Sequence, residues 1–388
     1  MSTRSLSALV SASCLLLLVA CGKKEEPPPP AAAAPAAPVY DTDAERVVNV
    51  YNWSDYIEPT VQEAFEKETG IKVNYEVMDS NEMLETKLVA GRTGYDVVVP
   101  SANFLARQIK SGIYQKLDKS KLDNLKNLDP DITKRLEVFD PGNEHAVNYM
   151  WGTSGIAYNV EAVAAIMPDA PLDSLAMIWD PKVVSKFADC GVAVLNVPTE
   201  VVGSVLFYLG KDANSENPED LAAAEKVMMA ARPYIRMISS DYVDELGAGE
   251  ICLGLDWSGD ALQAGGFALE EGKPFKIAYR LPREGAFMFL DTMAIPADAR
   301  HVKNAHIFIN YLLRTDVAAR NSDFTGFPSG NGLSWLQVAK DLVDDENFFP
   351  PPSMQEKLVP DLPESEEFTH QLLRTWARFR AGNKAKQR

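Results

Sequence analysis

The chain of 388 residues has few of the residue types from which metal and catalytic sites are usually built. It contains 4 histidines and 4 cysteines, and the histidines are not arranged at metal-ligand spacing. A glycine-rich phosphate loop and an H-E-x-x-H motif are both missing. The stretch Gly152-Thr153-Ser154-Gly155 lacks the spacing of a nucleophile elbow. We therefore expect no bound metal, no cofactor and no enzymatic activity.

Positive charge is also scarce. The sequence has 38 Lys and Arg against 55 Asp and Glu, which gives a formal net charge of −17. Such an acidic chain argues against nucleic acid as a partner, because phosphate binding requires basic patches. The acidity is compatible with a cationic ligand, although solubility explains it equally well.

The apolar stretch near the N-terminus, centred on Leu15–Val19, is too short for a stable membrane span. A single Arg precedes it, which is typical of a signal peptide over residues 1–20. The sequence Leu18-Val19-Ala20-Cys21 resembles the lipobox of bacterial lipoproteins, in which the Cys becomes the lipidated N-terminus. The alternative is a plain secretory peptide in which Cys21 is incidental. Residues 21–45 are then the lipidated Cys and a Pro/Ala-rich tether with nothing to bury.

Cys190 and Cys252 remain once the signal peptide is removed and Cys21 carries lipid. An even pair in an exported protein makes a disulfide the default expectation. Two free buried thiols are the alternative.

The first part of the chain alternates between strand and helix patterns. Strands are expected over Val47–Trp53, over the alternating stretch Ile71–Val77 and over Asp96–Pro100, and helices from Pro59 to Gly70, from Asn81 (as cap) to Gly91 and over Ala102–Ser111. This order implies parallel strands with helical crossovers.

A second pattern of the same kind begins after Trp151. Strands are expected over Gly191–Val197, Pro233–Ile238 and Ile251–Trp257, and helices over Pro198–Leu209, Pro218–Ala231 and Asp241–Leu246. We interpret the two patterns as two α/β lobes rather than one large sheet.

An aromatic ring followed by a carboxylate occurs twice, each time after a buried strand. Trp53-Ser54-Asp55 follows Val47–Tyr51, and Trp257-Ser258-Gly259-Asp260 follows Ile251–Leu255. Ligands of α/β sheets bind outside the carboxyl ends of the strands. A π face beside a carboxylate suits an organic cation, because the ring attracts the ammonium and the carboxylate accepts its N–H donors.

A third candidate lies within the predicted strand Ala286–Ile295. The period of two places Phe287, Phe289 and Asp291 on one face. A carboxylate in an apolar strand is seldom buried without a partner, so we expect Asp291 to have one.

The chain resembles the periplasmic polyamine-binding proteins of ABC importers, and the putrescine-binding branch most closely. The resemblance runs from about Val47 to the C-terminus. It is carried by VYNWSDYI (50–57), FEKETGIKV (65–73), DSNEMLETKLVAG (79–91), YDVVVPSANFLARQI (95–109), YQKLDKSKL (114–122), NLDP (127–130), YMWGTSGIAYN (149–159), CGVAVLN (190–196), ICLGLDWSGDALQA (251–264) and PREGAFMFLDTMAIPADA (282–299).

The resemblance implies a two-lobed periplasmic binding protein of type II, in which each lobe is a mostly parallel sheet flanked by helices. Lobe 1 would comprise residues 46–151 plus 283–331, and lobe 2 residues 152–282 plus 332–388. The ligand would lie in the interlobe cleft. The residues that match the family's ligand-binding positions are Trp53, Ser54, Asp55, Tyr56, Ser101, Glu200, Trp257, Asp260, Phe289, Asp291 and Phe327. Cys190 and Cys252 match the family's disulfide.

Three departures affect the expected ligand contacts. Phe327 stands where putrescine binders tend to have a tyrosine, and Thr199 replaces an acidic residue beside Glu200. The last 40 residues diverge, so no contact from Pro350–Glu366 is assigned.

The function implied by the resemblance is the capture of putrescine, or a similar short polyamine, and its delivery to an inner-membrane ABC permease. The protein would be a periplasmic, membrane-anchored lipoprotein and a monomer. A preference for spermidine and a role as ligand-presenting protein for a membrane polyamine sensor are the alternatives. A glycosidase-type enzyme with Asp260 and Glu200 as acid and base is a third.

Overall fold

The computed structural model describes residues 39–348, 350, 354 and 356–382. The predicted signal peptide (residues 1–20), the lipidation site Cys21 and the tether up to residue 38 lie outside the described residues. The last residues of the predicted tether contact the folded part, since the backbone N–H of Asp43 donates to Asn304 Oδ1 at 3.0 Å. Among the described residues, none of the helices combines the length and the apolar character needed to cross a membrane.

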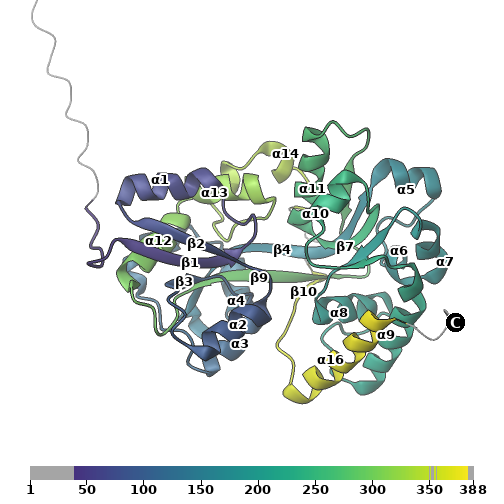
Figure 1. The fold of residues 1–388 in the computed structure, drawn as a ribbon, viewed down its shortest axis with the longest axis horizontal. Helices are drawn as coiled ribbons and strands as arrows, with labels where there is room; N and C mark the ends of the chain where they lie inside the picture. The colour runs from purple at the N-terminus through teal and green to yellow at the C-terminus, as the bar shows by residue number, and fades with distance from the viewer. Residues whose placement is uncertain (1–38, 349, 351–353, 355, 383–388) are drawn as a thin grey trace, which may run out of the picture. The chain divides into compact units, whose positions relative to one another are not determined.

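One long strand, β4 (Ala146–Asn159), belongs to both halves of the sheet (Figure 1). The strand order is β2-β1-β3-β9-β4-β7-β5-β6, with β10 on β9 and β8 on β4. Ala146–Thr153 of β4 pairs with β9 (Ala286–Ala294), and Ser154–Asn159 pairs with β7 (Leu253–Trp257) and β8 (Ile277–Arg280), all antiparallel. The strands thus form two groups, as the predicted two-lobed fold requires, and β4 is long enough to join both groups into one sheet.

The first half contains the parallel strands predicted from the sequence. Its elements are β1 (Val47–Trp53), α1 (Pro59–Thr69), β2 (Lys72–Met78), α2 (Asn81–Ala90), β3 (Val97–Val98) and α3 (Ala102–Lys110). β1 pairs in parallel with β2 and β3. Helix α1 begins at Pro59, whose fixed φ suits a first helical position, and ends at Thr69, where Gly70 with a φ of 69° caps it.

Two local predictions in this half are wrong. Ser80, not Asn81, caps α2, and its hydroxyl accepts from the N–H of Met83 at 3.1 Å. Asn81 is instead the first helical residue, and its side chain bonds Ser101 in both directions, each at 3.0 Å. The strand expected over Asp96–Pro100 is only two residues long, Val97–Val98, and at its end Pro100 has no N–H to donate.

The second half repeats the parallel arrangement. Its elements are β5 (Val192–Val194), α8 (Pro198–Tyr208), α9 (Pro218–Ala231), β6 (Met237–Ile238), α10 (Val243–Ala248), β7, α11 (Ser258–Glu270) and β8. β5 pairs in parallel with β6 and β7. The strand expected over Pro233–Ile238 is shorter than predicted, because Arg232–Tyr234 forms a 3-10 turn.

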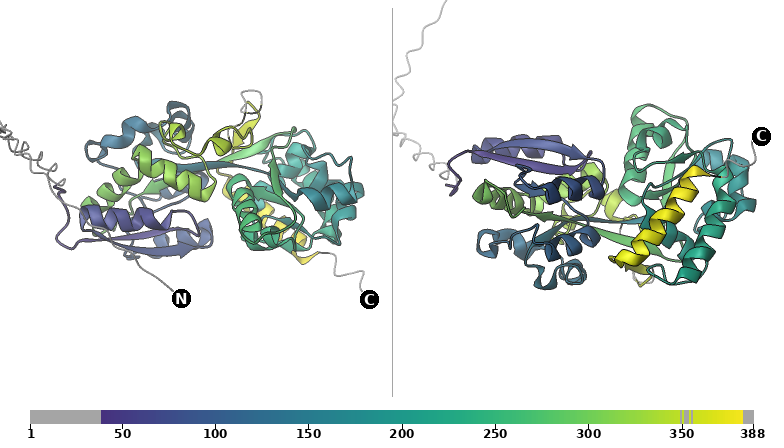
Figure 2. Two further views of the ribbon diagram at one scale, coloured as in Figure 1. Left: turned by 90° about the horizontal axis from the view of Figure 1, so that it is seen from above. Right: turned by 60° about the horizontal axis from the view of Figure 1, so that its bottom comes forward.

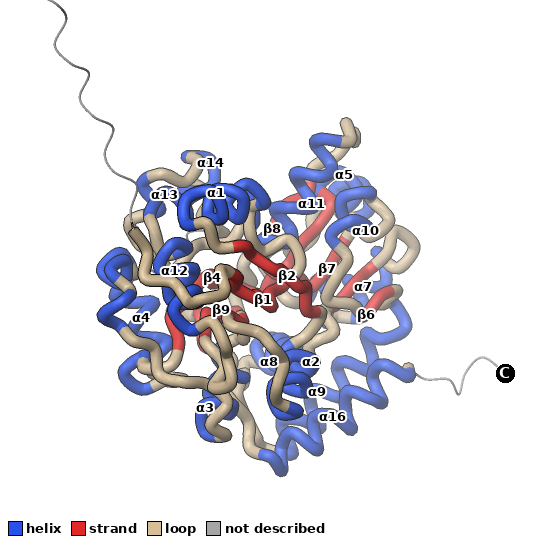
Figure 3. Tube along the Cα trace, turned by 60° about the vertical axis from the view of Figure 1, so that its left-hand side comes forward, coloured by secondary structure: helices blue, strands red, loops and turns tan. Residues whose placement is uncertain are grey.

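Helices lie on both sides of the strands (Figure 3). The remaining elements are α4 (Pro130–Leu136), α5 (Val160–Ile166), α6 (Ala176–Trp179), α7 (Pro181–Val184), α12 (Val302–Leu312), α13 (Thr315–Thr325), α14 (Lys340–Val343), β10 (Leu358–Pro360) and α16 (Glu366–Ala381).

The C-terminal segment joins the second half by way of the central strands. β10 pairs in parallel with β9, and α16 lies beside α9 (Figure 2). The Arg378 guanidinium donates to both carboxylate oxygens of Glu225, and Arg232 Nε donates to the carbonyl of Phe379 at 2.9 Å. The pairing of β10 with β9 places the residues after β10 next to the start of α8.

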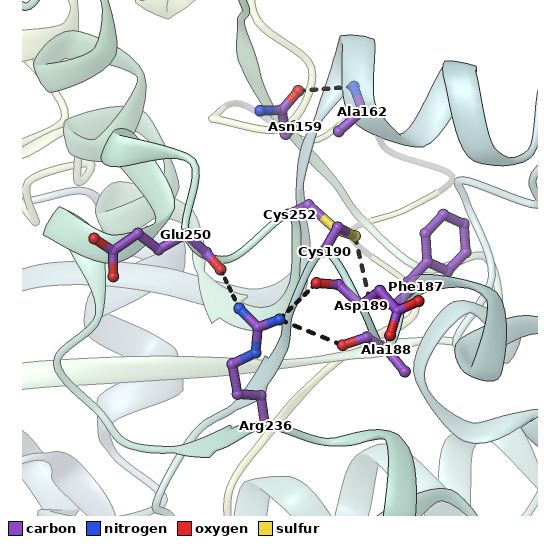
Figure 4. Close-up of a disulfide and its surroundings, with 9 residues drawn as sticks. All are labelled: Asn159, Ala162, Phe187, Ala188, Asp189, Cys190, Arg236, Glu250 and Cys252. Carbon is purple, nitrogen blue, oxygen red and sulfur yellow. Dashed lines mark hydrogen bonds between the residues drawn. A yellow bond between two sulfur atoms is a disulfide. The ribbon is translucent and has the colours of Figure 1, made fainter.

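Cys190 and Cys252 form a disulfide, as the sequence predicts (Figure 4). It joins the residues just before β5 and β7, whose Cα atoms are 5.7 Å apart. The Arg236 guanidinium holds the same two segments together, since it donates to the carbonyl of Glu250 at 2.7 Å and to that of Asp189 at 2.6 Å. The covalent link thus closes a loop of 62 residues in sequence.

Candidate functional site

A cavity of about 450 Å³ lies at the carboxyl ends of β1 and β7 and beside β9. All eleven residues predicted to bind ligand line it: Trp53, Ser54, Asp55, Tyr56, Ser101, Glu200, Trp257, Asp260, Phe289, Asp291 and Phe327. They come from both halves of the sheet. Their part in binding stays a prediction, but their convergence on one cavity is a property of the fold.

The charge of this cavity is of one sign. Among the described residues that line it, none is Lys, Arg or His, and eight are acidic: Asp55, Asp79, Glu82, Glu200, Asp241, Asp260, Asp291 and Asp361. Four of these, Asp79, Glu82, Asp241 and Asp361, were not among the predicted residues. A concave surface lined by one sign of charge concentrates counter-ions, so the cavity attracts cations.

Asp291 has the partners that its position in an apolar strand requires. Its side chain is 5% exposed. Ser101 Oγ donates to Oδ1 at 2.6 Å, and the Tyr56 hydroxyl donates to Oδ2 at 2.8 Å. Burial raises the pKa of Asp291 to about 6, although both hydrogen bonds oppose this shift. Ser101 is also the residue before α3, but its hydroxyl bonds Asp291 and so does not cap this helix.

Glu200 lies in the first turn of α8, close to Asp291. It accepts hydrogen bonds from Ser154 Oγ of β4 and from Trp257 Nε1, the latter at 3.0 Å. Burial raises the pKa of Glu200 to about 7, and repulsion from Asp291 adds to the shift. Glu200 and Asp291 therefore form one acidic group, named here the Asp291 group.

Asp260 lies in a second group of acidic residues, together with Asp256, Asp241 and Asp55. It lies in the first turn of α11, is half-buried, and has no side-chain hydrogen-bond partner among the described residues. Burial raises the pKa of Asp260 well above its usual range, and repulsion from Asp256, Asp241 and Asp55 adds to the shift. Asp55 is exposed and has a φ of 49°, a left-handed conformation that Asp tolerates better than most residues.

Edge-to-face aromatic rings form the apolar wall of the cavity. Ring centroids are 6.2 Å apart for Trp257 and Phe289, 5.7 Å for Phe289 and Phe327, and 5.4 Å for Phe327 and Tyr56. This packing needs close approach to the backbone. A Cβ at Gly259 would lie 2.3 Å from the Phe327 ring.

Two tryptophans differ in their relation to the cavity. Trp53 is half-buried and lines it, whereas Trp151 is buried inside β4 and is not among the lining residues. The structure places Trp151 in the core.

Asp361 is a lining residue that the sequence did not reveal. It is 9% exposed, and its Oδ2 accepts from Asn103 Nδ2 at 2.7 Å and from Thr199 Oγ1 at 3.0 Å. Burial raises its pKa, with added repulsion from Glu364 and Glu200. Asp361 also lines a smaller neighbouring cavity of about 170 Å³. Its position depends on the pairing of β10 with β9, which no local pattern indicates.

Buried carboxylates without a basic partner are unfavourable in their charged form. An organic cation would supply the missing charge, and the aromatic wall would contact its methylenes and its ammonium groups. Among the residues that the structure describes, no three or more His, Cys, Asp or Glu side chains are placed to hold a metal ion. The arrangement therefore suits an organic cation.

These carboxylates predict a stability that falls as the pH rises. Unfolded Asp and Glu have pKa values of about 4, whereas Asp291 and Glu200 titrate near 6 and 7 when folded. A raised folded pKa gives stability that is full below about pH 4 and is lost as the pH rises through about 6 to 7. We expect the free energy of unfolding of the unliganded protein to be lower at pH 8 than at pH 5, by about 2–4 kcal/mol.

Urea unfolding at the two pH values measures this difference. The variant Glu200→Gln should show a smaller pH dependence than the wild type, because one titrating group is gone. A free energy of unfolding that is equal or higher at pH 8 would contradict the raised pKa values.

The fold and the cavity together define a class. Two α/β halves that share crossing strands and enclose a cavity at strand ends are the architecture of type II periplasmic binding proteins. In agreement, residues 60–348 match the family of bacterial extracellular solute-binding proteins. The chain belongs to this family.

Individual relatives are similar over most of the chain. The chain is 46% identical to the putrescine-binding periplasmic protein SpuD of Pseudomonas aeruginosa, and the match covers 87% of this chain and 92% of the relative. It is 42% identical to the putrescine-binding periplasmic protein PotF of Escherichia coli, with the same coverage. The solved structure of the spermidine/putrescine ABC transporter substrate-binding protein PotD from Streptococcus pneumoniae superposes with a TM-score of 0.73 at 26% identity, over 87% of this chain and 99% of that one.

Proposed function

We propose that this protein captures putrescine, or a similar short polyamine, and delivers it to an ABC permease of the inner membrane. The observation that carries the proposal is the cavity, in which eight acidic side chains and no basic ones meet an aromatic wall. The similarity to putrescine-binding periplasmic proteins supports the choice of ligand. A capture-and-delivery role requires no chemistry on the ligand.

The two acidic groups would hold the two ends of the diamine. Asp260 would accept one ammonium, and Asp291 with Glu200 would accept the other. Trp53, Trp257 and Phe289 would line the slot for the butane chain. Each hydrogen bond to a charged group contributes roughly 1.5–3 kcal/mol, and a micromolar Kd corresponds to about 8 kcal/mol. Two or three such carboxylates with cation–π contacts therefore account for micromolar or tighter binding.

The other predicted residues would shape the slot. Ser101 and Tyr56 orient Asp291 through their hydrogen bonds, while Ser54 and Asp55 lie at the exposed edge of the cavity, where the Ser54 hydroxyl donates to Asp55 at 2.8 Å. Phe327 would add apolar wall without a hydroxyl contact.

Capture would involve closure of two lobes, residues 46–151 plus 283–331 and residues 152–282 plus 332–388. The hinges would lie near Trp151, in the middle of β4, and near Pro282, just before β9. A lipid on Cys21 and the tether of residues 21–45 would hold the protein, as a monomer, at a membrane facing the periplasm. A dication bound between the lobes would offset the repulsion among the carboxylates and so favour the closed state.

Calorimetry on protein freed of co-purified amines tests the function. Putrescine should bind with one site per chain and a Kd of micromolar or below, and 1,4-butanediol, which has the same chain and no charge, should not bind measurably. Absence of putrescine binding at millimolar concentration would overturn the proposal. Spermidine in the same titration tests ligand length, because tighter spermidine binding would overturn the preference for putrescine.

A further inference from the structure

A second carboxylate, Asp256 at the end of β7, precedes Asp260 by four residues and interacts with it electrostatically. It is the residue before Trp257 in β7 and is 2% exposed. Its Oδ1 accepts from the backbone N–H of Trp257 at 2.9 Å. Its Oδ2 is buried and has no hydrogen-bond partner among the described residues. Asp256 does not line the cavity, so it would act on a ligand through its charge and through Asp260, without touching the ligand.

The neighbours of Asp256 supply no positive charge. β4 and β5, which pair with β7 on either side, contain no Asp, Glu, Lys, Arg or His. Tyr242, at the start of α10, and Tyr279 of β8 face Asp256, and their hydroxyls donate to the carbonyls of Leu255 and Thr153 at 2.7 and 2.9 Å. Burial raises the pKa of Asp256, and the nearby Tyr242 hydroxyl lowers it by less.

The acidic side chain of α11 that interacts with Asp256 is Asp260, which Asp241 and Asp55 also repel. The N-terminus of α11 offers these carboxylates no more than the partial positive charge of a helix end.

Two carboxylates in such surroundings cannot both be ionised at low cost. Burial is the largest cause of the raised pKa of each, and the charge on Asp256 raises the pKa of Asp260 further. Interacting carboxylates of this kind titrate as a pair, in two steps that belong to neither residue alone.

We propose that Asp256 and Asp260 hold one proton between them when no ligand is bound, and that an ammonium group binding at Asp260 displaces it. This inference rests on the proposed function and identifies Asp256 as a positioning residue that acts through Asp260. In the step, one carboxyl O–H bond breaks and its proton passes to solvent. The ammonium keeps all its protons and donates an N–H to the freed carboxylate. Both carboxylates are then ionised beside the cation.

The variant Asp256→Asn tests the pair because it keeps the shape and the hydrogen-bonding capacity but cannot ionise. At pH 5.5 the wild-type pair is protonated, so wild type and variant should bind putrescine equally within about twofold. At pH 8.5 the wild type presents a second charge, so it should bind about tenfold more tightly than the variant, which corresponds to one pKa unit. Calorimetry at both pH values measures the ratio. A structural defect would lower the affinity by the same factor at each pH, and that result would overturn the inference.

Proton release gives an independent readout. Titration at pH 7 in two buffers of different ionisation enthalpy yields the number of protons released per putrescine. The wild type should release more protons than Asp256→Asn, because Glu200 and Asp291 titrate in both proteins. Equal release would overturn the inference.

The variant is not essential to the test. If Asp256→Asn does not fold, infrared difference spectroscopy of Glu200→Gln at pH 7 and saturating putrescine replaces it, because Glu200 itself titrates near 7. The protonated-carboxyl band should still decrease when putrescine is added. A band that does not change would overturn the shared proton. If the wild type binds putrescine but one of these tests contradicts the inference, the proposed function remains intact. If the wild type binds no putrescine at either pH, the proposed function itself is wrong.

Discussion

Replacement of Asp260 by Asn weakens putrescine binding at least tenfold and, at pH 8, stabilises the unliganded protein. Both effects have one cause. Asp260 has no side-chain hydrogen-bond partner among the described residues, and burial and three neighbouring carboxylates raise its pKa. A bound ammonium is the charge it lacks, and a hydrogen bond to a charged group contributes roughly 1.5–3 kcal/mol. Without ligand, the neutral amide removes an unfavourable charge.

Calorimetry and thermal unfolding at pH 8 measure the two effects. Glu82→Gln is the matched control, because Glu82 lines the same cavity and is exposed. Its affinity should change by less than about threefold, as exposed charges contribute little. Unchanged affinity in Asp260→Asn would show that this end of the cavity does not hold an ammonium.

Removal of the disulfide should have the largest effect on stability. The Cys190–Cys252 link closes a loop of 62 residues. Chain entropy assigns such a link a stabilisation of about 4 kcal/mol, through restriction of the unfolded chain. We expect the double variant Cys190→Ser/Cys252→Ser to lose about that much free energy of unfolding, measured with urea.

Putrescine affinity should change little in the double variant, because neither cysteine lines the cavity. Wild-type protein unfolded in the presence of a reductant is the control, and it should reproduce the loss. A loss below about 1 kcal/mol would mean that Arg236, which bonds both segments, suffices to hold them together.

Local chemistry explains why much of the site could be predicted. Trp53, Asp55, Trp257 and Asp260 directly follow apolar strands, and the carboxyl ends of parallel strands meet at one edge of a sheet. Asp291 could be singled out because a carboxylate in an apolar strand needs a partner, and Ser101 and Tyr56 are those partners. Glu200 follows the strand predicted over Gly191–Val197, and the family resemblance gave it a binding role. The resemblance also added Phe327, which no local rule would have selected.

One residue that escaped prediction depends on long-range pairing. Asp361 reaches the cavity because β10 adds to β9 and places it between Asn103 and Thr199. Asp256 also lies in a predicted apolar strand, Ile251–Trp257, so the rule that singled out Asp291 applies to it as well, but it was not applied there. In the described part of the structure, its burial and its unpartnered Oδ2 set it apart. The continuity of the sheet was missed because the pattern of β4 does not indicate that it serves two groups of strands.

A crystal structure of the protein with putrescine tests the central claim most directly. The account predicts one diamine in the cavity, with one nitrogen within hydrogen-bond distance of Asp260 and the other within hydrogen-bond distance of Asp291 or Glu200. Its methylenes should contact Trp257 and Phe289. Putrescine bound elsewhere, or bound in this cavity with Asp260 and Asp291 both out of reach of its nitrogens, would contradict the account.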